Sequence, residues 1–500
     1  MNQLKVGAIL SYVVIGLNTI VGLIYTPYML RMMGQHEYGL YSLVASVIAY
    51  LTLFDMGFGN AIVRYTSKYR AEQNYYKESE TYGMFFLLYS IIGLFVLLLG
   101  GLLVVNMECI FQESLDLNEI SRARIMMSLL IFNLAVTFPL SVFSAIVSSY
   151  EHFIFIKSLN IARIILNTLT MSILLYFGYK AVAMVVVQTI FNLTTLFAHY
   201  VYCQKIIHVK IIFGKINWSY VGEIFGYSVW IVLCMFMDKI YCSSGQFILG
   251  IYQGTVQVAI FAVAIQLLLI FIQFSTAISS VFLPKITRMS VQGKDKEISD
   301  IFIKVGNIQF FIVFLIMSGF IIFGQQFITL WAGEDYRPAY LMVVMLFVPY
   351  SIDLIENLGT TILQARNDMR FRSSALFIMS LICVGLEFIM APKYGGIGCS
   401  ASVAICIIIG HGFIVNWHFW KKQRIDIPMF GKSIFRKGIP LLLLSVPFFF
   451  YIHMHEQLSW IQLVSYIATY VVLYILVYGF ASISKSHRLQ IISQIKSNKK

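Results

Sequence analysis

The sequence is short of charge: only 12% of its 500 residues are Asp, Glu, Lys or Arg, whereas 59% are hydrophobic. A soluble protein of this length carries about 25% charged residues to cover its surface. The charges here come in short clusters between long apolar stretches, which is typical of many membrane-spanning helices joined by short loops. No loop between these stretches exceeds about 20 residues, which leaves no room for a soluble catalytic domain.

Catalytic and metal-binding motifs are also missing. The seven cysteines form no CxxC motif and no Cys/His ligand spacing, so neither a metal site nor a disulfide framework is expected. Gly431-Lys432-Ser433 resembles the end of a phosphate-binding loop, but Asp426 stands where its first glycine is required. There is no HExxH and no GxSxG motif. We therefore expect neither an enzyme nor a bound cofactor.

Apolar runs of sufficient length predict an all-α polytopic membrane protein of about fourteen transmembrane helices. The first run, from Val6 to about Tyr28, is longer than a signal-peptide core and is not followed by a small-residue cleavage site, so it is interpreted as the first helix. The predicted helices cover residues 6–30, 38–62, 81–105, 124–148, 158–178, 181–203, 223–250, 256–283, 305–330, 339–363, 373–391, 397–420, 438–454 and 459–483.

The basic residues predict the orientation of these helices, because Lys and Arg accumulate in cytoplasmic loops. With the N-terminus in the cytoplasm, 28 of the 36 basic residues fall in cytoplasmic segments and six in outer segments. Arg163 and Lys239 lie inside helices. Both termini are therefore expected in the cytoplasm. The net charge of +13 is mostly a topology signal, and nucleic-acid binding is not expected from it.

A weak internal repeat relates segments about 220 residues apart. Tyr41-Ser42-Leu43-Val44-Ala45 corresponds to Phe261-Ala262-Val263-Ala264-Ile265. Asn18 aligns with Asp238, and Gly34 with Gly254. Six helices separate the copies, which predicts two pseudo-symmetric six-helix lobes, the arrangement of transporters that bind substrate between lobes and rock to alternate access. The expected division is an N-lobe at 1–203, an interfacial linker at 204–222, a C-lobe at 223–420, and a last helix pair with a cytoplasmic tail at 421–500.

Ionisable residues within the predicted helices are candidate functional groups, because each costs about 2.5–3.5 kcal/mol at the bilayer centre. The alternative for each is an ion pair or hydrogen bond that locks neighbouring helices. Pro349 should bend or interrupt its helix just before Asp353 and Glu356. His411 is interpreted as interfacial. The substrate-cavity candidates are Asn18, Asp55, Asn60, Arg64, Arg163, Asp238 and Lys239, and the ion-coupling candidates are Asp55, Asp238, Asp353 and Glu356.

Several short segments resemble one transporter family. They are Glu37-Tyr38-Gly39-Leu40-Tyr41, Asp55-Met56-Gly57-Phe58-Gly59-Asn60, Arg64-Tyr65, and Leu283-Pro284-Lys285-Ile286. With these segments the chain resembles the polysaccharide-biosynthesis flippases, the O-antigen and capsule repeat-unit transporters of the multidrug/oligosaccharidyl-lipid/polysaccharide exporter superfamily. The resemblance covers nearly the whole chain in topology. Its motifs identify the superfamily better than the substrate.

The resemblance implies a protein of the bacterial inner membrane that moves an undecaprenyl-pyrophosphate-linked oligosaccharide to the periplasmic leaflet, as in lipopolysaccharide synthesis. Lys239, Arg163 and Arg64 would offer cations to the pyrophosphate, and membrane acids would take up H⁺ or Na⁺. Membrane lipids, a polysaccharide polymerase and a chain-length regulator are the implied partners. A drug/cation antiporter and a peptidoglycan-precursor flippase of the same superfamily are alternatives, and a membrane glycosyltransferase or polymerase is a rival from another class.

Overall fold

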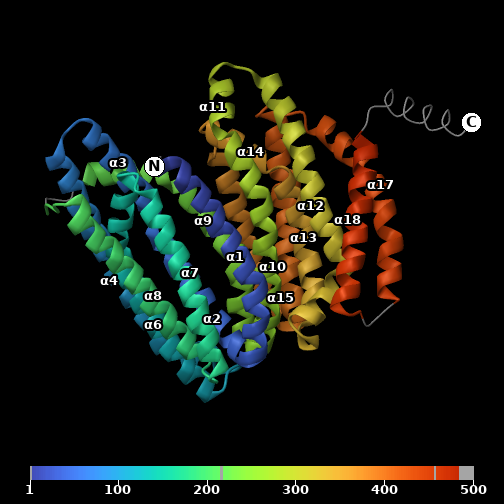
Figure 1. Ribbon diagram of the computed structural model, residues 1–500, viewed down its shortest axis with the longest axis horizontal. Coiled ribbons are helices and arrows are strands. Elements are labelled where there is room, and N and C mark those ends of the chain that lie inside the picture. The colour runs from blue at the N-terminus through green and yellow to red at the C-terminus, as the bar shows by residue number, and fades with distance from the viewer. Residues whose placement is uncertain (1–2, 214–217, 455–457, 483–500) are drawn as a thin grey trace, which may run out of the picture. The chain divides into compact units, whose positions relative to one another are not determined.

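The computed structural model describes residues 3–213, 218–454 and 458–482, and within these ranges the chain is all-helical (Figure 1). The predicted tail after residue 482 and residues 214–217 of the predicted linker lie outside them. The helices are α1 (Gln3–Met33), α2 (Gln35–Leu51), η1 (Thr52–Asp55), α3 (Phe58–Ala71), α4 (Tyr75–Val105), α5 (Met107–Phe111), α6 (Leu117–Ser149), α7 (Phe153–Tyr176), α8 (Ala181–Tyr202), η2 (Cys203–Ile207), α9 (Trp218–Tyr252), α10 (Gly254–Ser279), η3 (Ser280–Phe282), α11 (Leu283–Val291), α12 (Asp295–Trp331), η4 (Glu334–Tyr336), α13 (Ala339–Ile355), α14 (Asn357–Ala365), α15 (Arg370–Ile407), η5 (Ile408–Val415), α16 (Asn416–Lys421), α17 (Ile427–His453) and α18 (Trp460–Ser482).

The described residues contain eleven helices that are long and apolar enough to cross a membrane. A twelfth candidate is the pair α13 and α14, which is bent by 41°. These helices make the chain a multi-pass membrane protein, as predicted, but they do not confirm a count of fourteen. The predicted helices at 373–391 and 397–420 lie in one helical stretch, Arg370–Lys421, whose backbone is non-helical at Gly395 with φ 55°.

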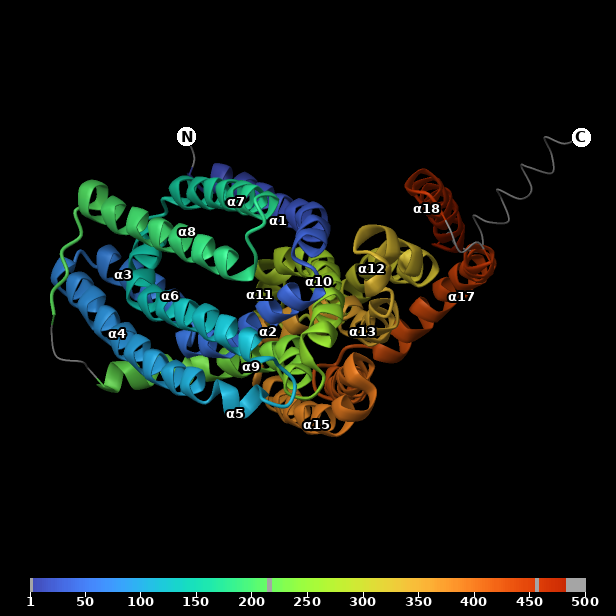
Figure 2. The ribbon, with the colours of Figure 1, turned by 90° about the horizontal axis from the view of Figure 1, so that it is seen from below.

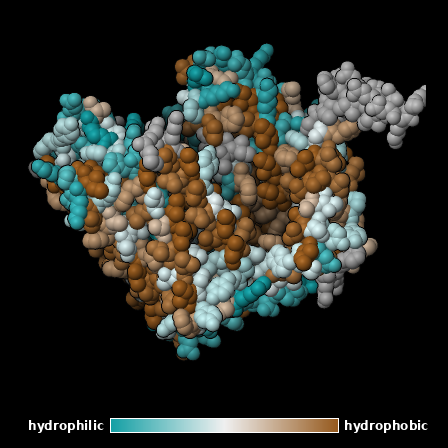
Figure 3. Space-filling view, in the orientation of Figure 1, coloured by the Kyte–Doolittle hydropathy of each residue, from teal (hydrophilic) through white to brown (hydrophobic). Residues whose placement is uncertain are grey.

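Apolar side chains cover much of the outer surface of the helices. On α4, for example, Ile91, Leu94, Leu98 and Leu102 are each more than half exposed. Figure 3 shows apolar residues along the helix flanks and hydrophilic residues gathered over the turn between α11 and α12. Exposed apolar flanks with polar ends are what a bilayer requires of a spanning helix.

Residues Met1–Ala262 and Ser380–Cys399 form one compact unit. In it α1 packs against α7, α4 against α6, and α6 against α8 (Figures 1 and 2). The predicted basic loops meet at one end of these helices. Arg70 donates to the carbonyl of Ser149 and lies over the Tyr150 ring, and the His152 ring is 2.6 Å from the Tyr202 hydroxyl. The turns expected on the cytoplasmic side therefore share one end of this unit.

Acidic residues balance the basic residues at the opposite end of this unit. Arg122 bonds to Glu37, whose side chain is only 6% exposed, and Arg124 lies 3.0 Å from Glu108. Asp116 and Glu119 form a capping box that begins α6 at this end. Two of the six basic residues expected in outer segments are thus neutralised by neighbouring acids. The outer end therefore carries little net positive charge, as the predicted orientation requires.

Residues Val263–Met379 and Ser400–Lys500 form the second compact unit. At one end Arg366 bonds to Asp295 at 2.7 Å, and Arg424 lies 3.3 Å from the same carboxylate. At the other end Gln326 donates to the carbonyl of Ile452 at 3.3 Å. The loops expected to be cytoplasmic again meet at one end of the unit, and the helix ends expected outside meet at the other.

The last two helices, α17 and α18, pack against α12 within this unit (Figure 2). Tyr470 is buried and donates to Ser318 at 2.7 Å, while its hydroxyl lies 2.9 Å from Ser445. Tyr474 and Tyr478 donate to backbone carbonyls of α12, both at 2.9 Å. Buried tyrosines need a partner for their hydroxyls, so these three side chains fix the depth and rotation of α18.

Backbone conformation recurs at the spacing of the predicted repeat. Gly34 and Gly254 have φ 78° and 75°, and each immediately precedes or begins a long helix. Gln73 and Gly293 have φ 54° and 68°, and each lies in the turn before α4 or α12. A positive φ thus recurs about 220 residues apart at two pairs of positions, three of them glycines, which is consistent with the repeat. The predicted lobe boundaries remain a prediction.

Candidate functional site

Arg163 belongs to a polar network inside the first unit, whose centre is Asn192. Its guanidinium on α7 donates to the amide oxygen of Asn192 on α8 at 3.3 Å. The amide nitrogen of Asn192 donates to Asn133 at 2.7 Å and to Thr137 at 2.8 Å, both on α6. The two donated bonds fix which way the Asn192 amide faces. Arg163 therefore has a neutral hydrogen-bond partner that does not cancel its charge.

Asp55 lies at a break in the second spanning segment. Helix α2 tightens into η1, and Met56 and Gly57 then adopt left-handed φ values of 49° and 68° before α3 begins. The hydroxyl of Tyr89, on α4, donates to the Asp55 carboxylate at 2.6 Å. Tyr89 is fully buried and stacks on Phe138 with ring centroids 6.1 Å apart. The Asp55 carboxylate is thus held against the rigid α4–α6 pair.

The other candidates of the first unit lie on three helices. Asn18 on α1 and Asn60 on α3 are exposed. Arg64, one turn after Asn60, is also exposed, and its guanidinium lies 5.7 Å from the Tyr65 ring centroid. On α9, Asp238 is exposed and Lys239 half-buried. Arg163 and Asp55 are each hydrogen-bonded to a residue outside the predicted set, Asn192 and Tyr89.

Asp353 forms an ion pair in the second unit. Its carboxylate lies 2.7 Å from Nδ1 of His411, on η5, and 3.7 Å from a guanidinium nitrogen of Arg372, on α15. Both partners are buried, with side chains 6% and 9% exposed. The interpretation of His411 as interfacial is therefore wrong, because a histidine near a helix end can still point into the protein. Asp353 thus ties α13 to α15 and η5.

Glu356 lies in the break between α13 and α14 and has a different partner. The amide nitrogen of Asn416 donates to the Glu356 carboxyl at 3.0 Å and to the Gly412 carbonyl at 3.3 Å. The Asn416 amide oxygen is buried and has no hydrogen-bond partner among the described residues. The helical conformation continues through Pro349 and ends at Ile355, so the interruption predicted at Pro349 lies at Glu356.

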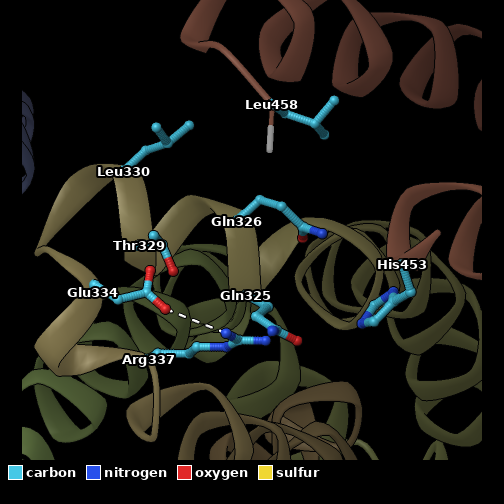
Figure 4. Close-up of a pocket in the computed structure, with 8 residues that line it drawn as sticks. All are labelled: Gln325, Gln326, Thr329, Leu330, Glu334, Arg337, His453 and Leu458. Carbon is cyan, nitrogen blue, oxygen red and sulfur yellow. Dashed lines mark hydrogen bonds and ion pairs between the residues drawn. The ribbon is translucent and has the colours of Figure 1, made fainter. Parts of the chain in front are cut away.

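A cavity of about 490 Å³ lies in the second unit, where α12 and α17 end (Figure 4). Its lining residues are Gln325, Gln326, Thr329, Leu330, Glu334, Arg337, His453 and Leu458. None of them was predicted from the sequence, because they lie near helix ends, where polar residues are common. Asn133 and Asn192 are likewise outside the predicted set, although isolated amides within apolar runs can be recognised in the sequence.

The polysaccharide biosynthesis protein family matches residues 4–290, more than half of the chain. No curated relative matches the sequence. Among solved structures, the chain is similar to the lipid II flippase MurJ in an inward closed conformation, with 17% identity and a TM-score of 0.69 over 96% of this chain and 98% of that one. It is also similar to an inward-facing multidrug resistance MATE transporter of the MOP superfamily, with 13% identity and a TM-score of 0.62 over 83% of this chain and 99% of that one.

A further MATE structure, in complex with MaD3S, aligns at 14% identity with a TM-score of 0.55 over 86% of this chain and 96% of that one. Identities this low establish a shared fold only, whereas the family match is made on sequence. The resemblance deduced from the short segments is confirmed. The chain belongs to the polysaccharide biosynthesis protein family and has the fold shared by MurJ and the MATE transporters of the MOP superfamily.

Proposed function

We propose that the protein is a flippase that moves an undecaprenyl-pyrophosphate-linked oligosaccharide repeat unit, such as an O-antigen or capsule unit, from the cytoplasmic to the periplasmic leaflet by alternating access. Family membership and a fold shared with a lipid II flippase over 96% of the chain support a transporter rather than an enzyme. The observation that carries the substrate class is Arg163, an intramembrane cation whose described partner is a neutral amide. A pyrophosphate supplies the missing negative charge.

The topology that we propose for it has fourteen spans with both termini in the cytoplasm of a bacterial inner membrane. This topology contains the twelve candidate spans and two more. One is α9, which has 35 residues, and the other results from dividing Arg370–Lys421 at Gly395. The gathering of the basic turns at one end of each compact unit supports the orientation. The lobes at 1–203 and 223–420, the linker at 204–222 and the last helix pair after 421 are part of the same proposal.

Transport can be measured with a fluorescent undecaprenyl-pyrophosphate oligosaccharide in proteoliposomes. Arg163→Gln removes the cation and should reduce flipping at least tenfold, because the guanidinium provides charge-assisted bonds to the pyrophosphate. Lys180→Gln is the matched control, since it removes an exposed charge next to α8. Undiminished flipping by Arg163→Gln, or equal loss with Lys180→Gln, would contradict the assignment of this site.

A peptidoglycan-precursor flippase is a second candidate, favoured by the similarity to the lipid II flippase. Its substrate carries the same lipid pyrophosphate, so Arg163 does not discriminate between the two. Competition does: excess lipid II should leave flipping of the labelled repeat unit unchanged if the chain is selective for a polysaccharide unit. Complete inhibition by lipid II would favour the second candidate.

Coupling to an H⁺ or Na⁺ gradient is part of the proposal. Among the acids considered, Asp55, Asp238, Asp353 and Glu356, the last has the most suitable surroundings for a proton. A protonated Glu356 carboxyl offers a donor as well as an acceptor to the Asn416 amide, whose oxygen has no partner among the described residues. Flipping should then respond to an imposed pH gradient in the wild type and lose that response in Glu356→Gln. A rate insensitive to both H⁺ and Na⁺ gradients would refute coupling.

A further inference from the structure

The cavity at the ends of α12 and α17 is built differently from the intramembrane sites. Its volume of about 490 Å³ is within the range of about 300–1,000 Å³ that small-molecule sites occupy. It lies at the end of the second unit opposite the Asp295–Arg366 pair, since Gln326, in its wall, is bonded to Ile452 near the end of α17. Figure 4 shows its polar side chains coming from α12, η4 and α17.

The charges at the rim of the cavity cancel. Arg337 donates to the Glu334 carboxylate at 3.2 Å. With the Gln325 amide turned so that all its partners are satisfied, its oxygen accepts from Arg337 at 2.7 and 2.6 Å. This orientation holds the guanidinium in place and leaves the amide nitrogen of Gln325 to donate elsewhere. The rim therefore offers fixed hydrogen-bonding groups with no net charge.

Unsatisfied hydrogen-bonding capacity lies deeper in the wall. Gln326 is 8% exposed, and while its nitrogen donates to Ile452, its oxygen has no partner among the described residues. The Nδ1 atom of His453 lies 3.0 Å from the Phe449 carbonyl, which assigns the proton to Nδ1 and leaves Nε2 as an acceptor. A buried acceptor without a partner is destabilising. The Gln326 oxygen is shielded where it lies, and a turn of its side chain toward the cavity would let a ligand donate to it and remove that cost.

We propose that this cavity binds a neutral, hydroxyl-rich sugar. Each sugar hydroxyl both donates and accepts, which matches an acceptor on Gln326, an acceptor on His453, a hydroxyl on Thr329 and a donor on Gln325. Leu330 and Leu458 supply an apolar part of the lining for the C–H face of a sugar ring. The amide, carboxylate, guanidinium and imidazole groups that line the cavity are planar, so the hydrogen bonds that they offer to a sugar have fixed directions.

Other ligand classes fit this lining less well. An anion finds its single guanidinium already paired with Glu334, and a cation finds that carboxylate already paired with Arg337. An apolar ligand would leave the Gln326 oxygen without a partner. A sugar of the transported glycan and a free sugar would contact the same groups in the cavity. Sugar binding therefore deepens the proposed function, and it rests on that function only if the sugar belongs to the transported glycan.

Binding can be measured by saturation-transfer NMR on the full-length protein in nanodiscs. The probes are free neutral hexoses and N-acetylhexosamines, with glucuronate and inorganic phosphate as anionic comparisons. We expect saturable binding of at least one neutral sugar, weakened about tenfold by Gln326→Leu and by Thr329→Val, because each removes one directed hydrogen bond. Gln309→Leu is the matched control: Gln309 is a fully buried glutamine on the same helix, bonded to Ser275 and Ser279.

Three results would overturn the proposal: no saturable binding of any neutral sugar, equal or tighter binding of the anions, or binding that Gln326→Leu and Thr329→Val leave unchanged. Thr329→Val keeps the shape of the side chain, so the test survives if Gln326→Leu does not fold. Competition decides where the bound sugar comes from. The lipid-linked substrate should displace a sugar that belongs to the transported glycan, and it should not displace an unrelated free sugar. Failure of the proposed function would be seen separately, as intact sugar binding in a protein that does not flip.

Discussion

Replacing Asp353 with asparagine should destabilise the second unit more than any other change to its intramembrane acids. The carboxylate balances two buried partners, His411 at 2.7 Å and Arg372 at 3.7 Å. Asparagine keeps the size and one acceptor oxygen but removes the charge. The guanidinium and imidazole would then remain in a region of low dielectric with less compensation.

The size of the effect follows from burial. Breaking a buried ion pair by removing one partner costs about 3–5 kcal/mol. Asp353 itself is 25% exposed, and solvent screening at its carboxylate favours the lower end, about 3 kcal/mol. At about 2–4 °C per kcal/mol for a unit of this size, the thermal midpoint should fall by about 6–12 °C.

Fluorescence-detected size-exclusion chromatography after heating measures this midpoint in detergent. Asp300→Asn is the matched control, because Asp300 is an exposed residue of the same unit, and it should change the midpoint by less than about 1 °C. If Asp353→Asn and Asp300→Asn have the same midpoint, Asp353 is not a structural ion pair. Its role would then have to be sought in transport.

Three further substitutions test local contacts. Tyr89→Phe should cost about 1 kcal/mol in thermal stability, since it removes only the bond to Asp55 and keeps the stacked ring; no change would mean that the bond is not formed in the membrane. Tyr470→Phe should cost about 1 kcal/mol, because two interhelical bonds of about 0.6 kcal/mol are lost, and protease protection of the last helix should fall with it. Arg122→Gln should cost about 1–2 kcal/mol by leaving the buried Glu37 without its cation, an effect that Glu37→Gln in the same chain should relieve.

The sequence predicts those features of the fold that depend on local composition. Apolar runs locate the helices, and basic clusters identify which ends of each unit belong together, because both signals are summed over many residues. The helix count depends on Gly395, because the positive φ of this one residue decides between one helix and two. The break at Glu356 rather than Pro349 has a similar cause, since a proline removes one hydrogen bond that a helix in a membrane can compensate.

The sites were less predictable because their partners are remote in the chain. Asn192 bonds to Asn133 across 59 residues, Asn416 bonds to Glu356 across 60, and the Tyr89–Asp55 bond spans 34. A single sequence shows that Arg163 and Asp353 are expensive to bury, but it does not show what offsets the cost. The distinction between a neutral amide at one and charged partners at the other appears only in three dimensions.

That distinction leads to a last prediction about Arg163. If its role were to lock helices, a carboxylate would offset the desolvation of its charge far better than an amide, as the partners of Asp353 illustrate. The Asn192 amide, oriented by Asn133 and Thr137, positions the guanidinium without neutralising it. Arg163→Met should therefore raise the thermal midpoint while abolishing flipping, the exchange of stability for activity that functional sites show. A lower midpoint together with intact flipping would mean that Arg163 serves the fold and that the pyrophosphate is bound elsewhere.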